Sequence, residues 1–433
     1  MNEDVLKNLK VVIKYLLFIY LFINIAYAKS NEIKPTLILV CSTCEIKSIQ
    51  VALDAIAENG TVRVLKGKYE NIELKVLKSL KLIGESGTVL DGGGKFQVIT
   101  VIHADNVSIE NFNIQNTGAS FTAELAGIRV IESKNCSIKN NNFHNTTYGI
   151  YLEKSENCIV QKNSFESYAK DETSSGNGIH MWTGASHKIL DNEIQGHRDG
   201  IYLEFVKGGF ISNNNVHHNL RYGLHFMSSN ETTYSENTFS SNGAGVAVMY
   251  SRKIKMFKNS FTHNLGASSY GLLLKEIVES EISQNLISAN TVGIYMEGSN
   301  RSLFKNNQIS QNGFGLKIMG DCENNEFTHN NFLQNTFEVM TNANHSWNSF
   351  SENYWSQYSG YDFNKDGFGD KPHRPVSLSS FILEKVDSAY ILLNSFFFQV
   401  LDEVERAFPE MIPEQLKDDK PKMERELFNV KNS

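Results

Sequence analysis

Hydrophobic positions along the chain repeat with a period of about 22 residues. A glycine followed by an apolar, a variable and an apolar residue recurs at Gly127, Gly149, Gly178, Gly200, Gly223, Gly245, Gly271, Gly293 and Gly315. An asparagine followed two residues later by an apolar residue accompanies it at Asn141, Asn163, Asn192, Asn214, Asn237, Asn259, Asn285, Asn307 and Asn330. Apolar and polar residues alternate within each unit, which is typical of short β-strands and not of helices.

Each unit therefore predicts one coil of two or three strands, and stacked coils predict an all-β, right-handed parallel β-helix. Coils in such a stack lie about 4.8 Å apart, so a single coil cannot bury its apolar face alone. Asparagine suits the turns because it tolerates the left-handed conformation, and stacked amides can hydrogen-bond along the rod. A leucine-rich repeat would require Leu-x-x-Leu-x-Leu units, which the sequence lacks.

The ends of the chain differ from the repeat. Lys7, Lys10 and Lys14 flank or enter an apolar run that ends at a small-x-small pattern, Ala26-Tyr27-Ala28. This run of roughly eleven residues is short for a membrane span of about 20, so residues 1–28 predict a cleaved secretory signal peptide, with an uncleaved anchor as the alternative. We further expect an N-terminal cap segment (29–59), a parallel β-helix (60–375), and a C-terminal helical segment and tail (376–433) that caps the coils.

Composition narrows the possible functions. The 433 residues carry a formal net charge of −7, which argues against a dedicated nucleic-acid binder. Hydrophobic residues make up 41% of the chain, enough for a large core.

The second and fourth positions after each repeat glycine are expected to point outward. In the middle coils these positions predict one exposed strip, formed by His180, Trp182, Tyr202, Glu204, His225, Met227 and Met249. One imidazole and two thioethers form a soft ligand set, so His225, Met227 and Met249 predict a Cu(I) site. Alternatively, the strip binds a partner without metal, through His180, Trp182, Tyr202 and Glu204. In a third interpretation, the alternation of inward and outward positions is shifted by one residue, and these residues belong to the core.

Two groups of cysteines have an open role. Cys41 and Cys44 form a CxxC motif that predicts either a redox or soft-metal pair or a structural disulfide. Cys136, Cys158 and His187 share one column of the repeat, which predicts either a disulfide between neighbouring coils or a ladder of buried thiols.

A second metal is suggested near the end of the repeat. Oxygen-bearing side chains alternate around Gly367 at Asp362, Asn364, Asp366 and Asp370, as in a calcium loop. Because His373 replaces the expected bidentate glutamate, a turn held by side-chain hydrogen bonds is the alternative.

An enzymatic function has little support. Polysaccharide hydrolases require a pair of carboxylates on one exposed face. Glu153 and Glu204 share a column but are two coils apart, with Trp182 between them, and Asp199 has no acidic partner in its own column. We therefore expect a protein that is not an enzyme, with a secreted β-helix enzyme acting on acidic polysaccharide as the alternative.

Several runs resemble the NosD family, the periplasmic maturation factors of nitrous oxide reductase. These runs are 177–182, 196–202, 220–227, 247–251, 353–355 and the 362–370 loop. The resemblance covers roughly residues 49–374 and implies a β-helix that works with an ABC transporter, made of the permease NosY and the ATPase NosF. It further implies that copper from the chaperone NosL is delivered to the reductase NosZ, and that the C-terminal end of the rod sits against the permease. The resemblance carries over no copper ligands, so the proposed site rests on the repeat columns alone.

Overall fold

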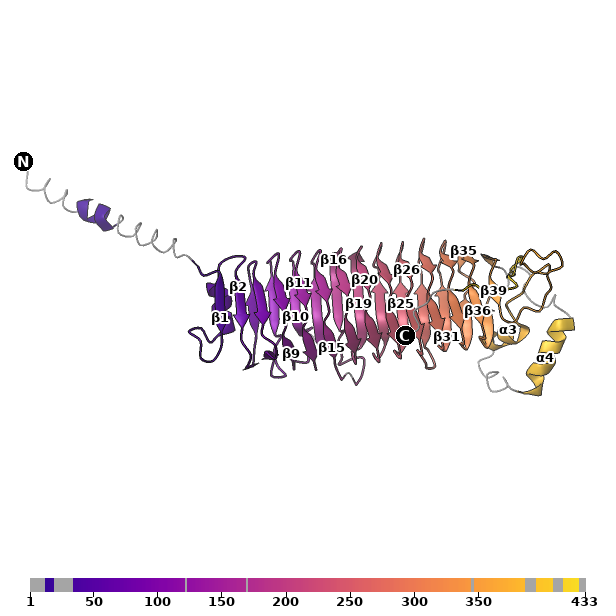
Figure 1. Cartoon of the computed structure of the whole chain (residues 1–433), viewed down its shortest axis with the longest axis horizontal. Helices are drawn as coiled ribbons and strands as arrows, with labels where there is room; N and C mark the ends of the chain where they lie inside the picture. Colours follow the sequence, from indigo (N-terminus) through magenta and orange to yellow (C-terminus); the bar gives the residue numbers. More distant parts are fainter. Residues whose placement is uncertain are drawn as a thin grey trace, which may run out of the picture.

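The chain folds into a long rod of stacked β-coils (Figure 1). The computed structural model describes residues 12–18, 34–120, 123–168, 170–343, 346–385, 395–407 and 416–427. Three parallel sheets run along the rod, and successive coils contribute one strand to each. The predicted all-β, right-handed parallel β-helix is confirmed.

Within the described residues, the three sheets contain 14, 12 and 13 strands. The first sheet consists of β1 (Leu37–Val40), β2 (Thr61–Val64), β5 (Lys81–Gly84), β8 (Ser108–Glu110), β11 (Ser137–Lys139), β14 (Ile159–Gln161), β17 (Lys188–Leu190), β20 (Phe210–Ser212), β23 (Thr233–Ser235), β26 (Lys255–Phe257), β29 (Glu281–Ser283), β32 (Leu303–Lys305), β35 (Glu323–Thr328) and β38 (Trp347–Ser351). The second sheet consists of β4 (Leu74–Val76), β7 (Ile99–Ile102), β10 (Ala126–Ile131), β13 (Tyr148–Glu153), β16 (Ile179–Ala185), β19 (Asp199–Lys207), β22 (Tyr222–Met227), β25 (Ala244–Met249), β28 (Tyr270–Lys275), β31 (Val292–Glu297), β34 (Phe314–Ile318) and β37 (Phe337–Thr341). The third sheet consists of β3 (Lys68–Glu70), β6 (Val89–Asp91), β9 (Asn113–Gln115), β12 (Asn142–His144), β15 (Ser164–Glu166), β18 (Glu193–Gln195), β21 (Asn215–His217), β24 (Thr238–Ser240), β27 (Ser260–Thr262), β30 (Leu286–Ser288), β33 (Gln308–Ser310), β36 (Asn331–Leu333) and β39 (Tyr354–Trp355).

Helices occur at both ends of the rod. At the N-terminal end, α2 (Ile49–Ala55) begins after Ser48, whose side chain accepts a hydrogen bond from the backbone N–H of Val51. Both β1 and α2 lie in the segment expected to form the N-terminal cap. Of the predicted signal peptide, only residues 12–18 are described, as a short helix, and the expected cleavage site lies outside the described residues. No helix in the described parts of the chain is both long and apolar enough to cross a membrane.

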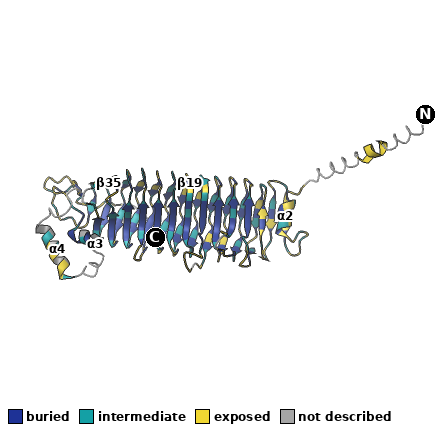
Figure 2. Cartoon of the chain, turned by 180° about the vertical axis from the view of Figure 1, so that it is seen from behind, coloured by how far each residue is buried: buried dark blue, intermediate teal, exposed yellow. Residues whose placement is uncertain are grey.

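The core runs inside the rod, because apolar side chains at the same position of successive coils stack on one another. Ile150 pairs with Ile128 of the preceding coil and with Ile179 of the following coil, and all three are fully buried. The rings of Phe143 and Phe165 stack in parallel, with centroids 4.6 Å apart. Figure 2 shows the buried residues as a continuous band across the strands, with exposed residues concentrated at the turns.

A ladder of buried asparagines follows one corner of the rod. In each step, the backbone N–H and the side-chain Nδ2–H of one asparagine both donate to Oδ1 of the next asparagine along the ladder. Asn237 donates in this way to Oδ1 of Asn259, at 3.1 and 3.0 Å. The predicted stacking of amides is therefore present. The ladder consists of Asn141, Asn163, Asn192, Asn214, Asn237, Asn259, Asn285, Asn307, Asn330 and Asn353.

The expectation that these asparagines adopt the left-handed conformation is wrong. The left-handed residue is the one before each of them, for example Lys162 with φ 55° before Asn163 and Glu236 with φ 57° before Asn237. The ladder residue must turn its amide inward to reach the next coil, so the reversal of the chain falls on the preceding residue. That residue faces outward, and several residue types therefore occupy it.

The C-terminal segment contains α3 (Leu378–Lys385) and α4 (Phe396–Ala407), which lie beside the last coils (Figure 1). Leu383 of α3 belongs to an apolar cluster with Phe314 and Met340, on the outer face of the second sheet. Residues 416–427 then return to the last coils, where Asp418 forms β-bridges to Phe350 and His373.

Candidate functional site

The candidate site lies on the outer face of the second sheet, between β13 and β25. The strand register aligns the second position after the repeat glycine in successive coils, in the order Tyr151, His180, Tyr202, His225 and Ala247. It aligns the fourth position in the order Glu153, Trp182, Glu204, Met227 and Met249. The first and third positions, such as Leu224 and Phe226, fill the core instead. The register thus brings all seven residues of the predicted strip onto one face.

The prediction that this strip is exposed is wrong for its two histidines. His180 is only 4% exposed and His225 only 5%. The His180 ring lies between Tyr151 and Tyr202, with centroid distances of 4.4 and 4.8 Å. The His225 ring lies 4.8 Å from the rings of both Tyr202 and Tyr222. Tyrosine rings of neighbouring coils, and for His225 also Tyr222 of its own strand, cover the imidazoles, which strand alternation alone does not predict.

His225 is oriented by a buried carboxylate. Its Nδ1 lies 3.4 Å from Oδ2 of Asp199, which is fully buried and forms an ion pair with Arg221 at 2.9 Å (Nε to Oδ1) and 2.5 Å (Nη2 to Oδ2). Burial opposes ionisation of this carboxyl, but the hydrogen bonds from Arg221 and His225 outweigh it and lower the pKa of Asp199 to about 2. The ionised carboxylate accepts the Nδ1–H, so the lone pair of neutral His225 lies on Nε2. This Nε2 is buried and has no hydrogen-bond partner.

His180 has a similar surplus nitrogen. Its Nδ1 lies 3.2 Å from Nδ2 of Asn177, while its Nε2 and the Oδ1 of Asn177 are both buried without partners. Burial is the main cause that lowers the pKa of His180 to about 3, so the ring is neutral at physiological pH. If the Asn177 amide is rotated by 180°, Oδ1 accepts Nδ1–H and the lone pair moves to Nε2.

The residues immediately before the repeat glycines were missed by the sequence analysis. Asn177, Asp199 and Tyr222 occupy this position, and all contact the outer histidines. A strict alternation counted from the glycine would place them inside. A Cβ on Gly200 would lie 2.3 Å from Cγ1 of Val216 and 2.7 Å from the carbonyl oxygen of Gly223. The chain is thus held tightly at the glycine, and the preceding side chain lies outside. The available signal was the polar or aromatic residue before each of the three glycines Gly178, Gly200 and Gly223.

Two methionines lie next to His225. Met227 is two residues further along β22, and Met249 pairs directly with it on β25. Both side chains are half-buried. The coil neighbour of His225 is Ala247, the smallest residue of its column from Arg129 to Lys317.

The five cysteines occur as one disulfide and three free thiols within the described residues. Cys41 and Cys44 form the disulfide, with a Cα–Cα distance of 5.0 Å, a bond that a redox pair and a structural disulfide have in common. Cys136 and Cys158 are buried and unlinked, as expected for a ladder of thiols. Next to them, Nδ1 of His187 accepts the backbone N–H of Cys158 at 3.2 Å.

The candidate calcium loop is an exposed turn whose oxygens already have partners. Asp362 accepts the backbone N–H groups of Asp366 and Gly367 at 3.2 and 2.9 Å. Asp366 accepts that of Phe368 at 2.9 Å, Asn364 that of Asp366 at 2.9 Å, and Asp370 that of Phe363 at 2.6 Å. The geometry is that of the alternative, a turn held by side-chain hydrogen bonds. Across the described ranges, no three His, Cys, Asp or Glu side chains converge to hold a metal.

The positions of Glu153 and Glu204 bear on a possible enzymatic site. Glu153 is bound by Arg129 at 2.6 Å, and the register places Trp182 between it and Glu204, so these carboxylates do not form a catalytic pair.

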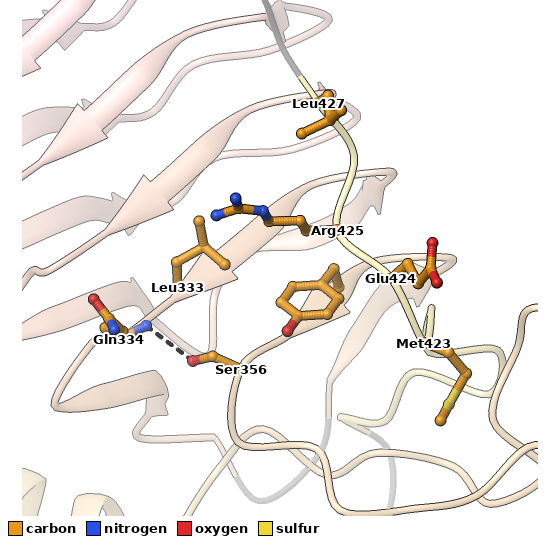
Figure 3. Close-up of a pocket in the computed structure, with 8 residues that line it drawn as sticks. Leu333, Gln334, Ser356, Met423, Glu424, Arg425 and Leu427 are labelled. Atoms are coloured by element: carbon orange, nitrogen blue, oxygen red, sulfur yellow. Dashed lines mark hydrogen bonds between the residues drawn. The ribbon is translucent and has the colours of Figure 1, made fainter.

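A groove of about 610 Å³ lies between the last coils and the returning tail (Figure 3). Its lining residues are Leu333, Gln334, Tyr354, Ser356, Met423, Glu424, Arg425 and Leu427.

Comparisons with known proteins agree with the β-helix fold and narrow the range of possible functions. A family model described as "Periplasmic copper-binding protein (NosD)" matches residues 78–171 and 166–360. The "Probable ABC transporter binding protein NosD" of Stutzerimonas stutzeri is 27% identical over 381 residues, which cover 83% of this chain and 86% of the relative. The protein of the same name from Pseudomonas aeruginosa is 25% identical over 419 residues, 92% of this chain and 96% of the relative.

A solved structure, the A-module of a mannuronan C-5 epimerase from Azotobacter vinelandii, is similar with a TM-score of 0.52. The structural match covers 73% of this chain and 91% of the module, and the sequence identity is 18%. Identity this low shows a shared fold alone.

Proposed function

The chain belongs to the NosD family of periplasmic copper-binding proteins, and we propose from this premise that it receives copper and delivers it to the metal sites of nitrous oxide reductase. Two curated relatives that match most of the chain are named as ABC transporter binding proteins. Those names describe binding proteins, and the chain is accordingly not an enzyme. The copper in this proposal is cargo that the protein passes on.

His225, Met227 and Met249 hold the copper in this proposal. The observation that carries it is the buried Nε2 of His225, which has no partner while its Nδ1 is held by Asp199. Metal-ligating histidines typically donate their other ring N–H to such a carboxylate, which fixes the tautomer and the ring orientation. Leaving a buried nitrogen unpaired costs free energy, and a bound cation removes that cost.

The ligand set favours monovalent copper. Thioether sulfurs are soft ligands that select Cu(I) over hard cations, and an imidazole nitrogen is compatible with it. Met249 pairs with Met227 across neighbouring coils, so both sulfurs start from adjacent positions on the face that carries His225. A site with one histidine and two methionines does not depend on a cluster of His, Cys, Asp or Glu side chains.

The same face supplies the proposed docking surface, formed by His180, Trp182, Tyr202 and Glu204. We propose the permease NosY and the ATPase NosF as the transporter partners, the chaperone NosL as the copper donor, and the reductase NosZ as the acceptor. Trp182 and Tyr202 are half-buried, and Tyr202 pairs with His225 of the next coil. Half-buried aromatic side chains are typical anchors of protein interfaces.

The test is an anaerobic Cu(I) titration of the purified mature protein in the presence of a competing chelator. We expect one tightly bound equivalent in the unmodified protein, and its loss in a variant with His225→Ala, Met227→Ala and Met249→Ala. Met319→Ala is the matched control, because Met319 is half-buried at the same fourth position of a later coil, where Lys317 replaces the histidine. Equal Cu(I) uptake by the triple variant and the unmodified protein would contradict this site.

A further inference from the structure

A second pair of imidazoles lies on a different sheet, away from the proposed copper site. His217 ends β21 of the third sheet, the sheet in which β9 and β15 are labelled in Figure 1, and His218 follows it. Their Nδ1 atoms are 2.8 Å apart, and the ring planes are perpendicular. Consecutive residues of a strand normally point to opposite faces. Here His218 adopts the left-handed conformation, with φ 53°, and this turn returns its ring to the side of His217.

Glu193, on the preceding coil, orients the first of these rings. Its Oε1 lies 2.5 Å from Nε2 of His217 and also accepts a hydrogen bond from Nδ2 of Asn215 at 2.9 Å. An ionised carboxylate accepts the Nε2–H, so the lone pair of neutral His217 lies on Nδ1. The Nδ1–H of His218 donates to that lone pair. His217 therefore has the carboxylate partner that is typical of a metal-ligating histidine.

We propose that His217 and His218 bind a divalent copper ion through their two Nδ1 atoms. Two nitrogens each about 2.0 Å from one metal and at right angles to each other lie about 2.8 Å apart, which is the geometry of neighbouring positions in a tetragonal Cu(II) site. The observed separation is 2.8 Å. A linear Cu(I) site would need nitrogens about 4 Å apart.

The ion takes the place of the proton shared by the two nitrogens. His218 then carries its proton on Nε2, and both rings stay neutral, so binding needs no redox step. The side chain of His217 is 17% exposed and His218 is exposed, which leaves the ion open to solvent. Water completes its coordination. This site is independent of the Cu(I) site proposed above, because it uses another sheet, harder ligands and another oxidation state.

The test is a titration of the full mature protein with Cu(II), with glycine as the competing ligand and electron paramagnetic resonance as the readout. We expect coupling to two imidazole nitrogens in the unmodified protein. His218→Gln should leave coupling to one nitrogen and weaken binding by more than about 10-fold, since even the loss of a residue that only orients a metal ligand costs about 10- to 100-fold. Glu193→Ala should weaken binding about 10- to 100-fold, whereas Glu193→Gln, whose amide oxygen still accepts the Nε2–H, should retain most of it.

His263→Gln is the matched control. His263 occupies the same left-handed, exposed turn position two coils further along the rod, but Thr262 precedes it in place of a histidine. We expect no change in this variant, nor in the variant that lacks His225, Met227 and Met249. A Cu(II) spectrum and affinity that are the same in His218→Gln and in the unmodified protein would overturn the proposal, whatever the outcome of the Cu(I) titration.

Discussion

Asp418 accepts hydrogen bonds at Oδ2 from both the backbone N–H and the Nδ2 of Asn353, each at 3.0 Å, although the two residues are 65 positions apart. Asn353 is the last residue of the asparagine ladder, and the next coil would have supplied the Oδ1 that accepts both groups. The returning tail supplies an aspartate oxygen in its place. The same oxygen accepts Nε1–H of the buried Trp355 at 3.0 Å.

Removing this carboxylate should destabilise the C-terminal end of the rod. Asp418→Ala leaves the buried backbone N–H of Asn353 and the Nε1–H of Trp355 without an acceptor, while the Asn353 amide keeps only backbone carbonyls such as that of Phe327. We expect the free energy of unfolding to fall by about 3 kcal/mol. Asp418→Asn keeps an oxygen in the position that asparagine fills elsewhere in the ladder and should lose less than about 1 kcal/mol. Urea unfolding of both variants measures the difference, with the exposed Asp419→Asn as control. Equal losses for alanine and asparagine at position 418 would disprove the role of Asp418 as the end of the ladder.

Acid should destabilise the rod partly through one buried histidine. His197 heads a second asparagine ladder, since its backbone N–H donates to Oδ1 of Asn219 at 3.0 Å and Asn219 in turn donates to Asn242, and the His197 ring is buried. Burial lowers the pKa of His197 to about 4. The unfolded chain has a histidine pKa of about 6.5, so this residue contributes stability above pH 6.5 that is lost as the pH falls to 4, about 3 kcal/mol in total.

His197→Asn should remove this part of the acid sensitivity, because asparagine does not titrate and suits the ladder position. Between pH 7 and pH 4, the free energy of unfolding of this variant should fall by about 3 kcal/mol less than that of the unmodified protein. The exposed His263→Asn should follow the unmodified protein. A variant at position 197 whose pH dependence matches that of the unmodified protein would contradict the assignment.

The repeat predicted the fold because one pattern is imposed on every coil. Glycine and asparagine columns recur at fixed spacing, so the register of the second sheet and the outward direction of His225 follow from counting residues. Contacts that depend on exceptions to the pattern were not predicted. Asp199 precedes a glycine at which the alternation changes, and Asp418 lies in a charged tail that carries no repeat at all. Neither position differs from a solvent-exposed one until the neighbouring coils are placed.

Asp199 should contribute to stability only while it is ionised. Its pKa is lowered from 3.8 to about 2 despite burial, chiefly by the hydrogen bond from Arg221 and then by that from His225. The corresponding stability, about 2 kcal/mol, is present above pH 4 and is lost as the pH falls toward 2. Asp199→Asn should therefore be less stable than the unmodified protein at pH 7, and the gap should narrow below pH 4. Asp191→Asn, at an exposed carboxylate, is the control.

The same substitution tests the proposed copper site by a separate measurement. Without an ionised carboxylate on Nδ1, the imidazole of His225 is no longer fixed in one tautomer, and Cu(I) affinity should fall about 10- to 100-fold. A competitive Cu(I) titration of the folded Asp199→Asn variant measures this loss. Unchanged affinity would show that Asp199 does not orient a copper ligand.

Docking on the outer face should depend on Trp182. Its side chain is half-buried on the outer face of β16, with the ammonium of Lys154 5.7 Å from the ring centroid, so Trp182→Ala leaves the interior of the rod intact. We expect this variant to bind the purified permease–ATPase complex at least about 10-fold more weakly, the loss typical of an aromatic anchor, while its Cu(I) titration is unchanged. Trp347→Ala, at a tryptophan that is 73% exposed on the first sheet, is the matched control and should bind normally. If both variants bind as the unmodified protein does, the transporter contacts another face of the rod.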